Sequence, residues 1–198
     1  MKLTIIRHGI TRGNLLGQHI GTTDIPLAEE GIRLARQSSA FMHEFDAYYC
    51  SPMLRTRQTA ALLFPGREII PFPGFQERDF GAYEEKTRED LADDPEYAAW
   101  YPEQISAPPG GESRDALIRR CAEAMERLVQ DAEGRNAENI VLVTHGNVIL
   151  ALMSHFTGSG RPYYDWLTEN CGGWTVEVRK DPLRFELTED RRKGWLDP

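Results

Sequence analysis

Two arginines and two histidines stand at positions where they could bind and attack a phosphate group. They are Arg7, His8, Arg55 and His145. A guanidinium group matches the oxygens of a phosphate with paired hydrogen bonds, and an unprotonated imidazole can attack phosphorus. Because the chain carries a net charge of −8, an anionic ligand needs such a local cluster of cations. These residue types therefore indicate phosphate binding or phosphate transfer.

Each of the four basic residues follows an apolar segment of strand type. The three segments are 3–6, 47–50 and 140–144. Apolar strands alternate with amphipathic helices along the chain, which predicts an α/β fold of three layers, with helices on both faces of a largely parallel sheet. The carboxyl ends of parallel strands meet at one edge of the sheet, where such folds bind ligands. We therefore expect the four basic residues to converge at that edge.

The remaining segments predict the elements around these strands. Helices are expected over 27–45, 52–64, 114–133 and 148–156, and further strands over 68–72, 174–178 and 183–187, the last two as a hairpin. Ser51 and Ser113 are the expected N-caps of the second and third helices, with Pro52 at the first helical position. The segment 81–111 is rich in aromatic and acidic residues and is expected to leave the sheet as a short helical, lid-like insertion. One domain over 1–198 is expected to hold all of these elements.

The composition argues against several classes of protein. A hydrophobic fraction of 40% is typical of a globular chain, and the negative net charge disfavours nucleic acid or an anionic membrane as a partner. Cys50, Cys121 and Cys171 lie far apart without metal-binding spacing, which indicates reduced thiols. No apolar run reaches membrane-spanning length, and the N-terminus has the pattern of a strand, not of a signal peptide. We expect a cytoplasmic protein, either a monomer or a homodimer.

Four motifs in a fixed order give the chain a resemblance to the histidine phosphatase superfamily, the phosphoglycerate-mutase-like enzymes. They are Arg7-His8-Gly9 with Asn14 after it, Ser51-Pro52-Met53-Leu54-Arg55 with Gln58-Thr59-Ala60, the stretch FQERDFG over 75–81, and Thr144-His145-Gly146. A single tripeptide recurs by chance, whereas four motifs in family order over residues 5–147 are specific.

The resemblance implies a role for each matched residue. His8 would be the nucleophile that forms a phosphohistidine, and Glu77 would protonate the leaving oxygen and then activate water. Glu84 and Glu85 lie nearby and are the rivals of Glu77 for that role. His145 would join these two as a catalytic residue that also holds a phosphoryl oxygen. The phosphoryl group would also be held by Arg7, Asn14, Arg55 and Gly146. No metal or other cofactor is implied, because the arginines supply the positive charge.

The segment between Glu77 and the long helix bears on the substrate. It is short and ends in PGGES over 109–113, which resembles the bacterial phosphatase branch of the family, including the α-ribazole-phosphate phosphatases of cobalamin assembly. Between Thr87 and Pro109, one cation, Arg88, stands against the carboxylates of Glu89, Asp90, Asp93, Asp94, Glu96 and Glu103. A second anionic group on the substrate would therefore be repelled. We expect a small phosphomonoester with a neutral or aromatic leaving group, with α-ribazole 5′-phosphate as one example.

Other functions remain open at this point. A phosphoglycerate mutase is the main alternative, and a non-catalytic module that binds phosphate or a phosphoprotein is an alternative of another class. A metal hydrolase with His8, His145 and Glu77 as ligands is the least favoured.

Three positions depart from the family pattern or have no assigned role, and Gly9 of the first motif has an expected backbone role. Ile10 stands where many relatives carry glutamate or glutamine, and Ala28 replaces a threonine that commonly caps the next helix. Arg12 could reach the phosphate or could be a solvated loop residue. Gly9 is expected to let the backbone pass close to a phosphate.

Overall fold

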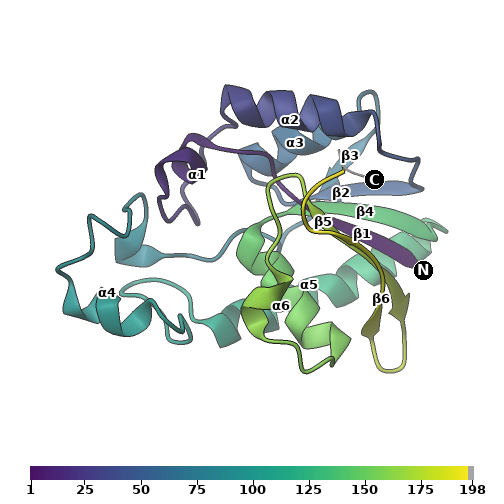
Figure 1. Cartoon of the computed structure of the whole chain (residues 1–198). Helices are drawn as coiled ribbons and strands as arrows, with labels where there is room; N and C mark the ends of the chain where they lie inside the picture. The colour runs from purple at the N-terminus through teal and green to yellow at the C-terminus, as the bar shows by residue number, and fades with distance from the viewer. Residues whose placement is uncertain (196–198) are drawn as a thin grey trace.

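A six-stranded sheet forms the centre of the protein (Figure 1). The computed structural model describes residues 1–195, and residues 196–198 of the expected domain lie outside the described residues. The strands lie in the order β3-β2-β4-β1-β5-β6. Their bounds are β1 (Lys2–Arg7), β2 (Ala47–Cys50), β3 (Ile69–Pro71), β4 (Asn139–Thr144), β5 (Gly173–Arg179) and β6 (Arg184–Arg191). The first four strands in chain order pair in parallel, whereas β5 and β6 form an antiparallel hairpin beside β1, which confirms a largely parallel sheet.

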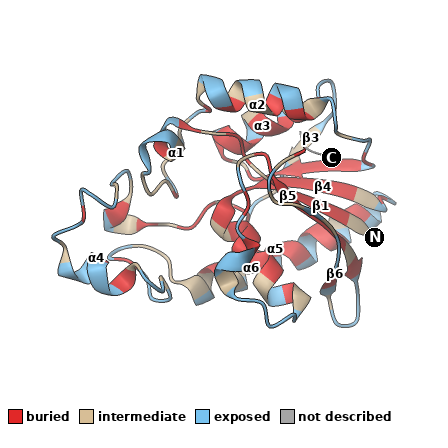
Figure 2. Cartoon of the chain, in the orientation of Figure 1, coloured by how far each residue is buried: buried red, intermediate tan, exposed pale blue. Residues whose placement is uncertain are grey.

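Helices cover both faces of the sheet, as expected for three layers. One face carries α2 (Glu29–Ser39) and α3 (Leu54–Leu63), and the other carries α5 (Arg114–Gly134) and α6 (Gly146–Thr157). Successive residues of β1 point to opposite faces, so Ile5 packs in the core beneath α5 and α6 whereas Ile6 packs in the core beneath α2 and α3. The inner strands are buried along most of their length (Figure 2), as parallel strands between two helical layers must be.

The register of the sheet brings the strand ends to one edge. Arg7 pairs with Thr144, and Cys50 pairs with Val143. The backbone N–H of His8 donates to the carbonyl of Thr144 at 2.8 Å, so the residues that follow β1 and β4 leave the sheet side by side.

Three predicted helices begin or end elsewhere in the structure, and one of them, expected over 148–156, begins at Gly146. The helix expected over 27–45 ends at Ser39, after which the chain turns, and Ala28 precedes it without a side-chain cap. The predicted N-cap Ser51 and the predicted first helical residue Pro52 are wrong: α3 begins at Leu54, after Met53, and the Ser51 hydroxyl binds His145 at 2.8 Å. The N–H of Leu54 is bound instead by the carboxylate of Asp24 at 2.7 Å. The predicted cap Ser113 is confirmed, since its hydroxyl accepts from the N–H of Ala116.

The segment 81–111 leaves the sheet and returns, as predicted, and is called the excursion below (Figure 1). It contains the short helices η1 (Gly81–Tyr83) and α4 (Pro95–Trp100). Its aromatic side chains pack into a cluster of their own, separate from the two cores of the sheet. Two short helices that the sequence did not predict, α1 (Arg12–Leu16) and η2 (Tyr163–Trp166), complete the described part of the chain. No helix within residues 1–195 is long and apolar enough to cross a membrane.

Candidate active site

His8 lies buried directly after β1, with a fixed ring orientation. Its Nδ1 lies 2.7 Å from the carbonyl oxygen of Gly9, and because a carbonyl only accepts, Nδ1 carries the proton. In the neutral ring, Nε2 is then the unprotonated nitrogen. Burial, with the nearby charges of Arg55 and Arg7 as smaller causes, holds the pKa of His8 well below its ordinary value of 6.5. The imidazole is therefore neutral and presents a lone pair.

The backbone around His8 is held by two residues that the sequence did not indicate. The Asn170 amide donates to the carbonyl of His8 at 2.9 Å, and the hydroxyl of Thr59 accepts from the N–H of Gly9 at 2.9 Å. Thr59 belongs to the motif Gln58-Thr59-Ala60, in which no role was assigned to it. Asn170 lies between η2 and β5, where the neighbouring sequence does not indicate a functional residue.

Arg55 projects from the first turn of α3 and is completely buried. Its Nε donates to Nδ1 of His145 at 3.2 Å, and its two terminal nitrogens donate to the carbonyls of Thr23 at 3.0 Å and Gly21 at 2.8 Å. These bonds use three of the five N–H groups of a guanidinium and leave one on each terminal nitrogen.

His145 follows β4 and is also neutral. Because Arg55 donates to Nδ1, the ring proton lies on Nε2, which donates to the Ser51 hydroxyl at 2.8 Å. Burial, followed by the charge of Arg55, lowers its pKa well below 6.5. The rings of His145 and His8 meet edge to face, with centroids 5.3 Å apart. Both nitrogens of His145 are thus engaged by protein groups, and its contact with a phosphoryl oxygen stays a prediction.

Arg7, at the end of β1, lies against the first turn of α6. One terminal nitrogen donates to the carbonyl of Thr168 at 2.7 Å, whereas Nε is buried without a partner among the described residues. A Cβ at Gly146 would lie 3.5 Å from this Nε, an ordinary van der Waals distance, so Gly146 lies directly beside the guanidinium. An anion that reached this Nε would bind a buried donor that has no partner among the described residues.

Glu77 is buried beside the start of α6. Its two carboxylate oxygens accept from the N–H of Arg78 at 2.8 Å and from the N–H of Asn147 at 3.2 Å. Glu77 also lies close enough to Arg7 and Arg55 for its charge to raise their pKa values against the larger, opposite effect of burial. The structure thus brings Glu77 together with both arginines.

Asn14 lies on α1, and its side chain helps to cap the N-terminus of this helix. Its side-chain oxygen accepts from the N–H and the hydroxyl of Thr11, which forms a capping box. The Asn170 amide also approaches this oxygen, at 3.4 Å. The amide nitrogen of Asn14 takes no part in these bonds, so its predicted role as a donor to phosphate stays open.

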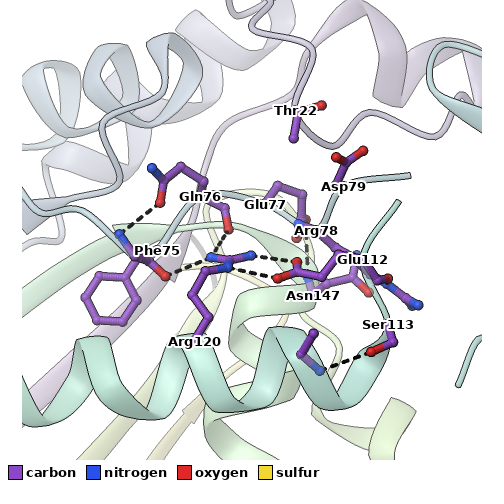
Figure 3. A network of polar contacts seen from close by, with 12 residues as sticks. Thr22, Phe75, Gln76, Glu77, Arg78, Asp79, Glu112, Ser113, Arg120 and Asn147 are labelled. Atoms are coloured by element: carbon purple, nitrogen blue, oxygen red, sulfur yellow. Dashed lines mark hydrogen bonds and ion pairs between the residues drawn. The ribbon is translucent and has the colours of Figure 1, made fainter. Parts of the chain in front are cut away.

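A cavity of about 620 Å³ lies beside Glu77 (Figure 3). Asp79 and Glu112 line it with carboxylates, and Thr22 and Ser113 contribute hydroxyl groups. The cation on its wall, Arg120, is already paired. Its Nε and one terminal nitrogen bind Glu112 at 3.0 and 2.7 Å, and the other terminal nitrogen donates to the carbonyls of Gly74 and Gln76 at 2.8 and 3.0 Å. The unpaired charge of this cavity is therefore negative.

Neither rival of Glu77 reaches this cavity. Glu84 accepts hydrogen bonds from the loop 21–23 and from Phe80, and Glu85 is exposed in a different cavity. Glu77 is thus the one of the three carboxylates that lies both on the cavity and beside the arginines.

The acidic residues expected to repel a second anion do not line the cavity. Five of them lie exposed on the excursion: Glu89, Asp90, Asp93, Glu96 and Glu103. The sixth, Asp94, is engaged in capping α4 through bonds to the N–H groups of Glu96 and Tyr97. The negative lining comes instead from Asp79, which precedes the excursion in sequence, because Glu112 is paired with Arg120.

Three further expectations concern the loop after His8. Gly9 packs against α2, because a Cβ there would lie 3.0 Å from the carbonyl oxygen of Gly31, and this packing explains the glycine better than approach to a phosphate. Ile10 lines a separate cavity of about 940 Å³ together with Leu34 and Arg7. Arg12 is exposed and lines a third cavity, away from Glu77.

Within the described residues, no three histidine, cysteine, aspartate or glutamate side chains are grouped so that they could hold a metal ion. The positive charge of the site belongs to Arg7 and Arg55. Cys50, Cys121 and Cys171 are buried free thiols and lie outside these contacts.

Known proteins are similar to this chain in sequence and in fold. A family model, "Histidine phosphatase superfamily (branch 1)", matches residues 3–191. The adenosylcobalamin/alpha-ribazole phosphatase of Salmonella typhimurium is 34% identical over 161 residues, which cover 78% of each chain. The metal-independent phosphoserine phosphatase of Arabidopsis thaliana is 29% identical over 79% of this chain and 68% of its own. The crystal structure of the alpha-ribazole phosphatase from Shigella flexneri superposes with a TM-score of 0.82 at 26% identity and covers 98% of both chains.

Proposed function

The chain belongs to branch 1 of the histidine phosphatase superfamily and is a phosphatase, and from that premise we propose that it hydrolyses a small phosphomonoester through a phosphohistidine, without a metal ion. One observation carries the proposal. The buried, neutral imidazole of His8 has Nδ1 fixed on the carbonyl of Gly9 and lies within the electrostatic reach of the half-buried guanidinium of Arg7 and the buried guanidinium of Arg55. This arrangement supports an oriented nucleophile beside a site for an anion.

In the first step, Nε2 of His8 attacks phosphorus as the P–O bond to the leaving alcohol breaks. Glu77, in its protonated form, gives its proton to the leaving oxygen, so that a neutral alcohol departs and His8 carries the phosphoryl group. The carbonyl of Gly9 keeps the Nδ1–H bond and stabilises the charge that the ring gains.

In the second step, water attacks the phosphorus of the phosphohistidine. The Glu77 carboxylate takes a proton from this water, the P–N bond breaks, and its electron pair returns to Nε2 of His8. Inorganic phosphate leaves, and both residues regain their first protonation states. Glu77 is therefore an acid and then a base.

Charge that develops on the transferred group is stabilised by Arg7 and Arg55. The Nε of Arg7, which has no partner among the described residues, and the two remaining N–H groups of Arg55 support this role, and Gly146 lies directly beside Arg7. Asn14 adds a neutral donor. His145 acts through Arg55, because its Nδ1 accepts a hydrogen bond from the Nε–H of that guanidinium.

The cavity beside Glu77 is where the leaving group lies in this proposal. Its lining by Asp79, beside an Arg120 that is already paired with Glu112, disfavours a second phosphate or carboxylate and favours a neutral, hydroxyl-bearing leaving group. α-Ribazole 5′-phosphate is one substrate of this kind, and the alpha-ribazole phosphatases that resemble the chain support its place in a substrate panel.

The proposal is tested by trapping the intermediate. Wild-type protein, His8→Ala and a control, His43→Ala at an exposed histidine, are mixed with a phosphomonoester labelled in its phosphoryl group and quenched in alkali. We expect alkali-stable, acid-labile label on the wild type and on His43→Ala, none on His8→Ala, and turnover that a chelator does not reduce. Turnover by His8→Ala at the wild-type rate would overturn the mechanism. Loss of activity with a chelator that zinc restores would overturn metal independence.

The substrate class is tested separately with a panel of phosphomonoesters. We expect α-ribazole 5′-phosphate and other esters of neutral alcohols to be hydrolysed faster than 3-phosphoglycerate. Interconversion of 2- and 3-phosphoglycerate at a rate above hydrolysis would replace this proposal with the mutase alternative.

A further inference from the structure

Glu84 is the most heavily hydrogen-bonded carboxylate of the excursion, although it lies outside the cavity beside Glu77. Its two oxygens accept from the N–H groups of Gly21, Thr22, Thr23 and Phe80 and from the Thr23 hydroxyl, at distances of 2.7 to 3.2 Å. An ionised carboxylate only accepts hydrogen bonds, and both oxygens of Glu84 are occupied by these donors. Glu84 therefore fixes the conformation of the loop 21–23, which supplies most of them.

The same loop holds Arg55 from its other side. The carbonyls of Gly21 and Thr23 accept from the two terminal nitrogens of the Arg55 guanidinium. In the peptide unit between Gly21 and Thr22, the C=O accepts a hydrogen bond from Arg55 and the N–H donates one to Glu84. Since the two groups of a trans peptide point in opposite directions, this unit lies between a cation and an anion with its dipole aligned to both.

The packing at Gly21 shows how close this approach is. A Cβ at that position would lie 1.9 Å from the carbonyl oxygen of Arg78 and 2.4 Å from a carboxylate oxygen of Glu84. The loop therefore sits directly on the start of the excursion, with no room for a side chain between them.

From these contacts we propose that Glu84 is a positioning residue of the active site. It holds the loop 21–23 so that the carbonyls of Gly21 and Thr23 orient the Arg55 guanidinium toward the phosphoryl group. This role rests on the proposed function, in which Arg55 binds phosphate. Glu84 touches neither substrate nor the reacting atoms, and acts only through the loop.

Replacing Glu84 with glutamine leaves one acceptor oxygen and turns an NH₂ group toward the N–H donors of the loop. The carbonyls of Gly21 and Thr23 then lose their fixed position, and Arg55 loses two of its three anchors. We therefore expect Glu84→Gln to weaken the binding of phosphate by the folded protein, beyond any decrease in the amount of folded protein.

The experiment measures the competitive inhibition constant of inorganic phosphate in Glu84→Gln and in a control, Glu85→Gln. Glu85 carries the same charge one residue along and is exposed. We expect the inhibition constant to rise about tenfold in Glu84→Gln, as for the loss of a charge-assisted bond, and to stay at the wild-type value in Glu85→Gln. A loss of folded protein alone lowers kcat without changing this constant.

An Arg55→Lys background separates positioning from stability. Because Glu84 acts through Arg55, adding Glu84→Gln to Arg55→Lys should leave the inhibition constant at the value of Arg55→Lys alone, while the melting temperature still falls. Equal increases in both backgrounds would overturn the proposal, as would an unchanged constant in Glu84→Gln.

The two levels of the proposal fail in different ways. A wild-type inhibition constant in Arg55→Lys would overturn the phosphate-binding role of Arg55 in the proposed function. A raised constant in Arg55→Lys together with a wild-type constant in Glu84→Gln would overturn the role of Glu84 alone. If Glu84→Gln does not fold, Thr23→Val removes one bond to Glu84, and an inhibition constant that does not rise there would overturn the role as well.

Discussion

Arg55 donates through Nε to Nδ1 of His145 at 3.2 Å, so the arginine of α3 and the histidine after β4 form one buried unit. The bond sets the tautomer of His145, because a guanidinium only donates. A proton added to Nδ1 would take up the lone pair that accepts this bond and would then lie against the N–H of Arg55. The folded protein therefore holds His145 neutral, as it also holds His8.

The first prediction concerns stability against pH. The unfolded chain takes up protons on His8 and His145 below their ordinary pKa of 6.5, whereas the folded protein does not, because burial lowers both pKa values. Unfolding thus binds protons, and stability is full above pH 6.5 and falls below it. Between about pH 7.5 and about pH 5.5, we expect urea denaturation to show a loss of up to about 1.4 kcal/mol per histidine for each unit below 6.5.

A variant assigns this loss to its source. His8→Asn should lose less stability over the same pH interval than the wild type, whereas His43→Asn should lose as much. An unfolding free energy that stays constant over the interval would contradict the prediction.

The second prediction concerns the acid. If Glu77 protonates the leaving oxygen, Glu77→Gln should lower kcat/KM, which reports the first step without the hydrolysis of the phosphohistidine, by about 10²–10⁴-fold for an alkyl phosphomonoester. The loss of kcat/KM for para-nitrophenyl phosphate should be much smaller, because a nitrophenolate leaves without protonation. Steady-state kinetics with both substrates checks this, with Asp93→Asn, at an exposed carboxylate, as the control. Equal losses on both substrates would assign Glu77 another role.

The third prediction concerns Arg120, which binds the carbonyls of Gly74 and Gln76 just before Glu77. Arg120→Lys cannot keep these bonds and the paired bonds to Glu112 at once. We expect kcat for an alkyl phosphomonoester to fall about tenfold, because the acid is displaced by a fraction of an ångström. The inhibition constant of inorganic phosphate should stay unchanged.

A matched control for Arg120→Lys is available on the same helix. Arg119 is exposed, and Arg119→Lys should behave as the wild type in both assays. A weaker inhibition by phosphate in Arg120→Lys would show instead that Arg120 affects the phosphate site.

The fourth prediction tests the packing of α2 on the loop after His8. A Cβ at Gly31 would lie 2.1 Å from the carbonyl oxygen of Ile10, which accepts from the N–H of Ala28. Gly31→Ala should therefore destabilise the protein by about 1–3 kcal/mol. Gly134→Ala, in α5 with open space around the new methyl group, should be neutral or stabilise by up to about 1 kcal/mol. Urea denaturation of both variants gives the comparison, and equal effects would contradict the prediction.

The sheet and the convergence of its four basic residues could be predicted from the sequence. Apolar segments mark the strands, and the carboxyl ends of parallel strands share an edge, so Arg7 and His145 had to lie close together. The end of α3 was predicted correctly, but its cap was not. The hydroxyl of Ser51 had a local partner in the helix and a distant one in His145, and only the fold decides between them.

Residues that act through backbone groups could not be predicted. Asn170, Glu84 and Arg120 bind carbonyls or N–H groups of segments far along the chain, and such groups carry no sequence signal. The sequence predicted a negatively charged substrate site, which is the correct sign, but assigned the charge to acidic residues of the excursion that do not line the cavity. Acidic residues of the excursion could be counted from the sequence, but whether Glu89 or Asp79 faces the cavity depends on the fold.

The separate aromatic cluster of the excursion has a consequence for how relatives of this protein diversify. Phe80, Tyr83, Leu91, Tyr97 and Trp100 share no side chain with the cores on the sheet, so the excursion can be recombined between homologues without repacking either core. The contacts of Glu84 with the loop 21–23 set a limit to such exchange. A chimera that joins foreign sequence after Glu84 keeps these contacts with the loop, whereas one joined before Glu84 takes over whatever residue the foreign sequence has at this position.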